Sequence, residues 1–379
     1  MDSKRQKRRL ALICTNLNQL GGANRHFKNI YKYLDRDKFK VTIFFCSTIE
    51  RELKDIMLKE GVLENDIVFL SRFNKWLVIP FIFELKKAFI SKGTDIVHTC
   101  DIQSDIFGAL AARLAGINDI YALFESRIIP ENTPLIMRIF YRTMNMIVKG
   151  LFVKTIVVSE GLRREVISGR FRDPDNVRVI HLGFNIPDKY RYKEWPFEKL
   201  IQGSPLIGTI SRLSEEKGIE RFVNVVPAIL RSIPDARFTI IGKGPEEARL
   251  KMMARQLGVA SSIVFKGWTD DVLSEIEEMD LFVMPSIREG CPNALFEALA
   301  LSRPVVASKI DGISDIIKDG INGLLVDTAS PDKFAEKIIY LCKNAQKAIL
   351  MGKSGQSTVR SEFTIEKEVR ELKSLYCGL

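Results

Sequence analysis

The stretch of residues 284–326 constrains the fold of this chain more than any other. It begins within the end of an apolar strand pattern at residues 281–286 and turns through a small loop that carries Glu289 and Pro292. Apolar residues then recur at the spacing of one buried helix face, and residues 303–308 read as another buried strand. A strand, a loop, a helix and a second strand in this order predict one unit of a parallel sheet in an α/β protein.

Two carboxylates bracket the start of this helix. Glu289 lies in the loop and Glu297 about two helical turns later, so they are too widely spaced for the close acid pair of a hydrolase. The two side chains can instead hold the two ends of one extended ligand. The backbone amides of Asn293, Ala294 and Leu295 would face the same space, and a helix N-terminus favours a phosphate group there. An ordinary strand–helix–strand unit explains the apolar residues but gives no reason for the two glutamates.

This stretch resembles the C-terminal signature of the retaining glycosyltransferases of family 4, which have the GT-B architecture. The matching residues are Glu289, Gly290, Pro292, Glu297, Ala298, Ala300, Pro304, Val305, Val306 and Ala307. The chain departs from the family at Ser302, where Gly is usual, and at residues 311–315, where the family usually has GGxxE. The resemblance implies that Glu289 and Gly290 lie at the donor sugar and that Glu297 contacts the ribose.

A second motif supplies two cations. A strand pattern ends at Ile210, and the loop after it offers Arg212 and Lys217 before the next helix. Two cations five residues apart at the carboxyl end of a strand can both reach one diphosphate. The segment also resembles a family 4 pattern, with matches at Gly208, Arg212, Leu213, Lys217 and Gly218. The resemblance implies that Arg212 and Lys217 neutralise the departing nucleotide diphosphate, and with Glu289 they are the expected catalytic residues.

Further donor contacts are expected from glycine turns and one tryptophan. Trp268 lies in a segment that resembles the loop beside the nucleotide base in family members. A glycine turn at residues 242–244 lacks the third glycine of a dinucleotide fingerprint, because Glu247 occupies that position, so an NAD site is disfavoured. Glycines at the end of a strand let a phosphate or sugar approach the backbone closely. The glycines expected at the donor are Gly21, Gly22, Gly242 and Gly244.

Candidates for the acceptor side fall in the first half of the chain. His98 lies near the carboxyl end of a predicted strand, where open α/β sheets bind ligands, and a purely structural histidine is an equally open interpretation. The family often has a second His two residues later, where this chain has Cys100. In the next such loop Glu125 and Arg127 stand where family members carry a His or an Arg. We therefore expect His98, Glu125 and Arg127 on the acceptor side.

Length and charge bound the organisation of the chain. Its 379 residues suffice for an N-terminal acceptor domain (1–190), a C-terminal nucleotide-sugar domain (200–360) and a last helix (361–379) that crosses back to the first domain. Residues 1–195 carry 33 Lys and Arg against 22 Asp and Glu, so the whole net charge of +10 belongs to this half. This asymmetry indicates an anionic partner such as a membrane surface, a pyrophosphate-bearing lipid or nucleic acid.

Several classes of protein are disfavoured by the sequence. No apolar run approaches the length of a spanning helix, and the basic N-terminus precedes too short an apolar segment for a signal peptide. The six cysteines are scattered without a CxxC pair, which indicates reduced thiols in the cytoplasm. No carboxylate cluster suggests a metal site, and we expect no cofactor. No aromatic-basic recognition motif supports binding to nucleic acid.

Strands that alternate with helices throughout predict an α/β protein with two doubly wound, Rossmann-like domains facing a central cleft. The resemblance implies a retaining glycosyltransferase that moves a sugar, with a UDP-sugar favoured as donor, to a hydroxyl of a lipid-linked or polysaccharide precursor. We expect this enzyme at the inner face of the cell membrane, bound to its anionic surface. Two alternatives stay open, a GT-B nucleotide-sugar epimerase and a non-catalytic nucleotide-sugar-binding partner, the latter because of Cys100 and Glu125.

Overall fold

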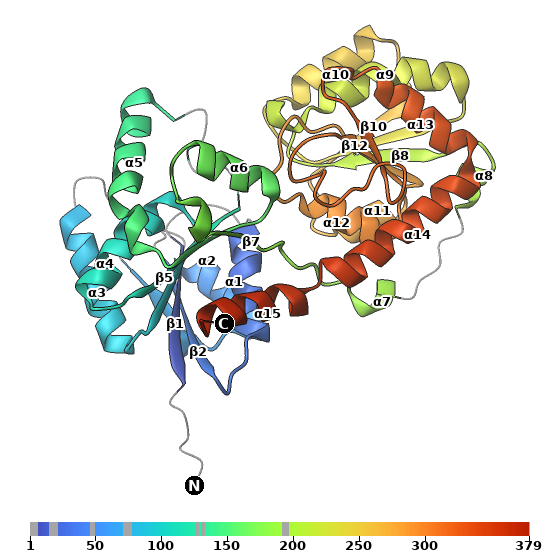
Figure 1. Cartoon of the computed structure of the whole chain (residues 1–379). Coiled ribbons are helices and arrows are strands. Elements are labelled where there is room, and N and C mark those ends of the chain that lie inside the picture. Colours follow the sequence, from blue (N-terminus) through green and yellow to red (C-terminus); the bar gives the residue numbers. More distant parts are fainter. Residues whose placement is uncertain are drawn as a thin grey trace. The chain divides into compact units, whose positions relative to one another are not determined.

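The computed structural model describes residues 7–14, 22–45, 50–70, 78–125, 129, 133–191 and 197–378, without the side chains of 22–25, 50–52 and 191. The chain divides into two compact units (Figure 1). The first unit comprises residues 1–183 and 365–379, and the second comprises residues 184–364. Each unit is an α/β fold built on one parallel sheet, as the sequence predicted.

The first unit contains a seven-stranded sheet with the strand order β3-β2-β1-β4-β5-β6-β7. Its strands are β1 (Arg8–Cys14), β2 (Phe39–Phe45), β3 (Ile67–Phe69), β4 (Ile96–Thr99), β5 (Asp119–Phe124), β6 (Lys154–Val157) and β7 (Val177–Val179). The chain builds the sheet outward from β1 to β3 and then restarts on the other side of β1 with β4. β1 and β4 therefore flank the topological switch point, where such sheets bind ligands beyond the carboxyl ends of their strands.

Helices cover both faces of this sheet. They are α1 (Gly22–Tyr33), α2 (Glu50–Lys59), α3 (Val78–Lys92), α4 (Ala109–Leu114), α5 (Leu135–Val148), α6 (Glu160–Ser168) and α15 (Ile365–Tyr376), with short turns η1 (Glu64–Asp66), η2 (Ser104–Gly108), η3 (Lys149–Leu151) and η4 (Pro174–Asn176). Helices α3, α4 and α5 pack in one apolar cluster with the strands. On the other face, Phe27 of α1 and Tyr376 of α15 pack against His98 of β4. Burial on both faces explains why β1 is an almost continuous apolar run.

The second unit contains a six-stranded sheet with the order β10-β9-β8-β11-β12-β13. Its strands are β8 (Leu206–Ile210), β9 (Arg237–Ile241), β10 (Ile263–Gly267), β11 (Leu281–Met284), β12 (Val305–Ser308) and β13 (Leu324–Val326). Its helices are α7 (Asp188–Arg191), α8 (Glu198–Ile201), α9 (Ile219–Ser232), α10 (Glu247–Gln256), α11 (Val272–Glu277), α12 (Asn293–Ala300), α13 (Lys333–Lys343) and α14 (Ala345–Glu362), with turns η5 (Glu215–Lys217) and η6 (Ala260–Ser262). Here β8 and β11 flank the switch point.

The units meet in the sequence at Gly183 rather than at residue 190. Ile186 and Tyr190 are buried in the apolar core of the second unit, so the segment before α8 belongs there. The last helix, α15, packs in the first unit, where Tyr376 is fully buried and the Tyr121 hydroxyl donates to the Leu375 carbonyl at 2.9 Å. Among the described residues, no helix is both long enough and apolar enough to cross a bilayer.

Candidate active site

The loops after β8 and β11 meet at the switch point of the second unit. The first loop carries Arg212 and Lys217, and the second carries Glu289. The backbone joins the two loops directly, because the amide of Ile287 donates to the carbonyl oxygen of Glu216 at 2.9 Å. Two segments far apart in the sequence therefore form one surface at the carboxyl end of the sheet.

The centre of this surface is an ion pair between Lys217 and Glu289. Lys217 Nζ lies 2.8 Å from Oε1 and 2.9 Å from Oε2 of Glu289. The Ser286 hydroxyl donates to the same Oε1 at 2.7 Å, and the carboxylate is 7% exposed against 24% for the lysine side chain. The buried carboxylate thus fixes an ammonium group whose remaining surface faces solvent. Sequence reasoning missed Ser286, because a serine that follows a strand is common and marks no particular function.

Arg212 lies in the same loop as Lys217 and is oriented by a second carboxylate. Its Nη2 lies 2.6 Å from Glu216 Oε1, and its Nε donates to the Ser214 hydroxyl at 3.2 Å. Burial alone would raise the pKa of Glu216, but hydrogen bonds from Ser214 and Arg212 hold it at about 2. Glu216 is therefore charged at neutral pH and holds a guanidinium group that is 63% exposed. Sequence reasoning missed Glu216, although it lies between the two predicted cations.

The glycines after β9 let two loops approach each other. A Cβ atom on Gly242, which has φ +131°, would lie 1.8 Å from the Ser211 carbonyl oxygen. A Cβ atom on Gly244 would lie 2.2 Å from the Leu213 carbonyl oxygen. These glycines therefore support the loop that carries Arg212, and a direct contact with the donor stays a prediction.

The start of α12 fits the predicted phosphate contact only in part. The Leu295 amide donates to the Pro292 carbonyl oxygen at 3.1 Å, and the Leu295 side chain is fully buried. Leu295 is therefore not placed to contact a donor, because the first turn of the helix already uses its amide. Asn293 and Ala294 are half-buried and remain candidates, and Glu297 is buried on the same helix.

The loop that carries Glu289 and Gly290 packs against a second glycine. A Cβ atom on Gly312, at φ +83°, would lie 2.6 Å from the carbonyl oxygen of Gly290. Any side chain there would push the loop away from its place. Packing against Gly290 thus explains why position 312 is a glycine. This position lies within residues 311–315, the segment that departs from the family pattern.

Trp268 offers an apolar surface at the edge of the same sheet. It follows the edge strand β10, its ring is 68% exposed, and its Nε1 donates to Asp270 Oδ1 at 3.1 Å. An exposed indole fixed at its polar end is suited to stacking against a nucleotide base. This position is compatible with the predicted role.

On the acceptor side, His98 and Glu125 both lie near His26, but their surroundings differ. His98 has no exposed surface, its Nδ1 is hydrogen-bonded to the Tyr376 hydroxyl, and burial lowers its pKa well below the ordinary value. Such a neutral, enclosed ring fits the structural interpretation of this histidine and not a contact with an acceptor. Arg127 lies outside the described residues, as does Gly21, while Gly22 is the first residue of α1.

Glu125 directly follows β5 and lies near the buried His26 and Glu368. Burial raises the pKa of Glu125 to about 7, although the nearby His26 acts in the opposite direction. His26 is hydrogen-bonded to Glu368 of α15, whose other carboxylate oxygen accepts from the Gly183 amide at 2.7 Å. Among the described residues, Glu125 Oε1 is buried and has no hydrogen-bond partner. Because its pKa is near 7 and it follows a central strand, Glu125 remains a candidate for contact with the acceptor.

Matches to family models cover most of the chain. Residues 20–186 match the model described as Glycosyltransferase Family 4, and residues 204–344 match the model described as Glycosyl transferases group 1. The predicted donor-site residues of the second unit, from Arg212 to Glu297, all fall within the second match.

Similarity to individual proteins extends over both units. The chain is 25% identical over 294 residues to the UDP-Gal:alpha-D-GlcNAc-diphosphoundecaprenol alpha-1,3-galactosyltransferase of Escherichia coli, covering 75% of this chain and 76% of that protein. It is 30% identical over 284 residues to the GDP-mannose-dependent alpha-(1-6)-phosphatidylinositol monomannoside mannosyltransferase of Mycobacterium tuberculosis, covering 69% and 72%. The crystal structure of Anabaena HepE in complex with UDP matches at a TM-score of 0.82 and 18% identity, covering 98% of this chain and 100% of that one. This last likeness confirms the predicted GT-B fold.

Proposed function

The chain belongs to glycosyltransferase family 4, as its sequence predicted, and we propose that it transfers a sugar from a nucleotide-sugar to a hydroxyl acceptor with retention of configuration. The observation that carries this proposal is the Lys217–Glu289 pair at the switch point, with Arg212 beside it. A nucleotide diphosphate carries the charge that these two cations would neutralise.

The proposed reaction breaks the bond between the anomeric carbon and the diphosphate oxygen. Lys217 and Arg212 stabilise the negative charge that develops on the departing diphosphate, which lowers the barrier without a metal ion. Glu289 holds the Lys217 ammonium in place and contacts the donor sugar. The acceptor oxygen attacks the same face that the diphosphate leaves, and its proton passes to a phosphate oxygen of the leaving group. No side chain of the protein is assigned as a nucleophile.

A UDP-sugar is the proposed donor. The HepE structure contains UDP and the E. coli relative is named for UDP-Gal, whereas the mycobacterial relative is named for GDP-mannose. We expect UDP at a hundred times its Kd to raise Tm by roughly 5–10 °C in a panel with GDP and ADP. Arg212→Ala should lose most of this shift, whereas Arg249→Ala, which removes an exposed arginine of α10, should keep it.

The outcomes of this panel test the choice of UDP and the presence of the donor site separately. A shift with GDP alone would contradict the choice of UDP but keep the transferase. No shift with any nucleotide would contradict the donor site itself.

The proposed acceptor is a lipid-linked or surface-polysaccharide precursor at a membrane. Relatives are named for an undecaprenyl diphosphate and a phosphatidylinositol substrate, and another for capsular polysaccharide biosynthesis in Staphylococcus aureus. The positive charge of the N-terminal half suits the anionic surface on which such acceptors lie.

Helix α5 supplies the surface for this contact. Its exposed apolar side chains are Leu135, Ile136, Ile139, Phe140, Met146 and Ile147, each between 40% and 80% exposed. Their spacing places them along one side of the helix, while Asn145 and Val148 face the core. Arg138 and Arg142 are exposed on the same helix, which carries no acidic residue. A helix with this distribution of apolar and basic side chains is suited to lie in the interface of an anionic bilayer.

We expect the protein to sediment with vesicles that contain anionic lipid, and more weakly with neutral ones. The double variant Ile136→Ser with Ile147→Ser should reduce the bound fraction several-fold, because it removes two exposed apolar side chains from the proposed interface. The matched control, Met252→Ser with Leu257→Ser, removes exposed apolar side chains from the second unit and should bind like the wild type. Equal binding of all three proteins would contradict a role for α5.

A further inference from the structure

Two cysteines meet at the switch point of the first unit. β1 ends at Cys14, and Cys100 follows the last residue of β4. The parallel register pairs Leu12 with His98 and Ile13 with Thr99, so the next step of the ladder places Cys14 beside Cys100. Both residues are thiols, and they are 2% and 9% exposed. Side chains alternate between the faces of a strand, so both thiols lie on the face that His98 shares.

A carboxylate completes a compact group with these thiols. The Sγ atoms of Cys14 and Cys100 and a carboxylate oxygen of Asp101 all lie within 4.8 Å of one another. In a tetrahedral zinc site, bonds of about 2.3 Å to sulfur and about 2.0–2.2 Å to oxygen place the ligand atoms about 3.6–3.8 Å apart. The three atoms would therefore approach one another by at most roughly 1 Å to bind one ion.

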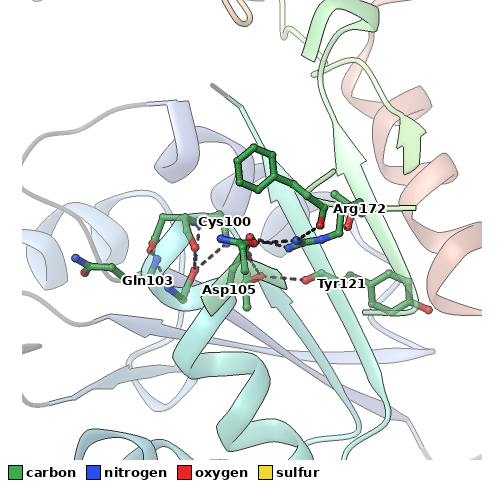
Figure 2. A network of polar contacts seen from close by, with 11 residues as sticks. Cys100, Gln103, Asp105, Tyr121 and Arg172 are labelled. Carbon is green, nitrogen blue, oxygen red and sulfur yellow. Dashed lines mark hydrogen bonds and ion pairs between the residues drawn. The ribbon is translucent and has the colours of Figure 1, made fainter. Parts of the chain in front are cut away.

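The turn that carries two of these groups is fixed by its own hydrogen bonds. The Ser104 hydroxyl oxygen accepts from the amides of Cys100 and Asp101 at 3.2 and 3.0 Å. Figure 2 shows this turn, with Asp105 just beyond it in an ion pair with Arg172. Both members of that ion pair are buried. The ligands would therefore be held before an ion arrives, which reduces the entropy lost on binding.

We propose that Cys14, Cys100 and Asp101 bind a thiophilic divalent cation of the zinc class. Two thiolates and one carboxylate would fill three positions of a tetrahedron and leave the fourth for water or a ligand oxygen. Magnesium and calcium are disfavoured because they take oxygen ligands. The ion would lie in the first unit, whereas Arg212, Lys217 and Glu289 lie in the second. The proposal is therefore independent of the proposed transferase function.

Two adjacent thiols can either bind a metal ion or form a disulfide. Disulfide formation needs an oxidant and a thiolate that attacks, whereas metal binding needs no oxidant. A metal ion displaces the thiol protons directly, so binding should release about two protons and strengthen as the pH rises.

The test is a titration of the purified full chain with Cd²⁺ and with Zn²⁺ in the presence of a phosphine reductant. One equivalent of Cd²⁺ should produce the ultraviolet charge-transfer band of two cadmium–thiolate bonds, and Zn²⁺ should compete it away. Cys14→Ser and Cys100→Ser should each weaken binding by more than about tenfold and halve the band, and Asp101→Asn should weaken binding with the band retained. The matched control Cys377→Ser removes an exposed thiol and should bind like the wild type.

Three results would overturn the proposal. The first is the lack of a thiolate band in the wild-type protein, which needs no variant and so does not depend on how a variant folds. The second is unchanged cadmium binding in both cysteine variants when circular dichroism shows them folded. The third is rapid loss of two thiols to oxidised glutathione together with no cadmium band, which would identify the pair as a disulfide switch.

Discussion

Replacing Lys217 with alanine should lower kcat/KM for sugar transfer by about 10²–10³-fold. The Lys217 side chain is more exposed than the Glu289 carboxylate with which it pairs, at 24% against 7%, and in the proposed reaction it stabilises the charge on the departing diphosphate. Glu289→Gln should reduce the rate by a similar factor, because it removes the charge that fixes Lys217 and replaces one of the two oxygens facing the ammonium with an NH2 group. Steady-state transfer from a radiolabelled nucleotide-sugar to a membrane lipid extract measures both effects.

A control variant distinguishes the loss of a lysine at the proposed site from the loss of a lysine elsewhere in the second unit. Lys318→Ala also removes a paired lysine of the second unit, but this lysine is 58% exposed and contacts Glu362. It should keep the wild-type rate and Tm. Full activity in Lys217→Ala or in Glu289→Gln, with the protein folded, would contradict their place in the catalytic site.

The sequence could predict that Arg212, Lys217 and Glu289 lie near one another because each of them follows a strand. Arg212, Lys217 and Glu289 each come after a predicted buried strand, and the carboxyl ends of parallel strands share one edge of the sheet. The contact between Lys217 and Glu289 still required knowledge of which strands are neighbours. The periodicity of apolar residues predicts a strand but not the position of that strand in the sheet. The pairing of β8 with β11 therefore could not be predicted from the sequence.

The first unit shows the same limit more strongly. His98 was expected near an acceptor, but α1 and α15 enclose it, and α15 lies at the far end of the sequence. The scattered cysteines indicated only reduced thiols, since the adjacency of Cys14 and Cys100 depends on the register between β1 and β4. Buried polar groups of this kind depend on tertiary packing, and no local pattern marks them.

Replacing Arg172 with methionine should lower the free energy of unfolding of the first unit by about 3–5 kcal/mol. The guanidinium group is buried, donates to Thr155 Oγ1 at 2.9 Å and to Asn145 Oδ1 at 2.8 Å, and lies 3.4 Å from Asp105 Oδ2 (Figure 2). It also lies over the Phe152 ring at 4.4 Å. Without it, Asn145 Oδ1 loses its donor, and the buried Asp105, which still accepts from Thr99 Oγ1, loses its counter-ion. Both losses are costly for buried polar groups.

Urea unfolding followed by circular dichroism measures this loss, and two further variants identify its cause. Arg178→Met removes an exposed arginine of β7 in the same unit and should change stability by no more than about 0.5 kcal/mol. Adding Asp105→Leu to Arg172→Met should restore part of the lost stability, because no unpaired carboxyl group then remains in the core. If the double variant were less stable than the single one, the loss would come from packing and from the hydrogen bond of Thr99 to Asp105, rather than from the broken ion pair.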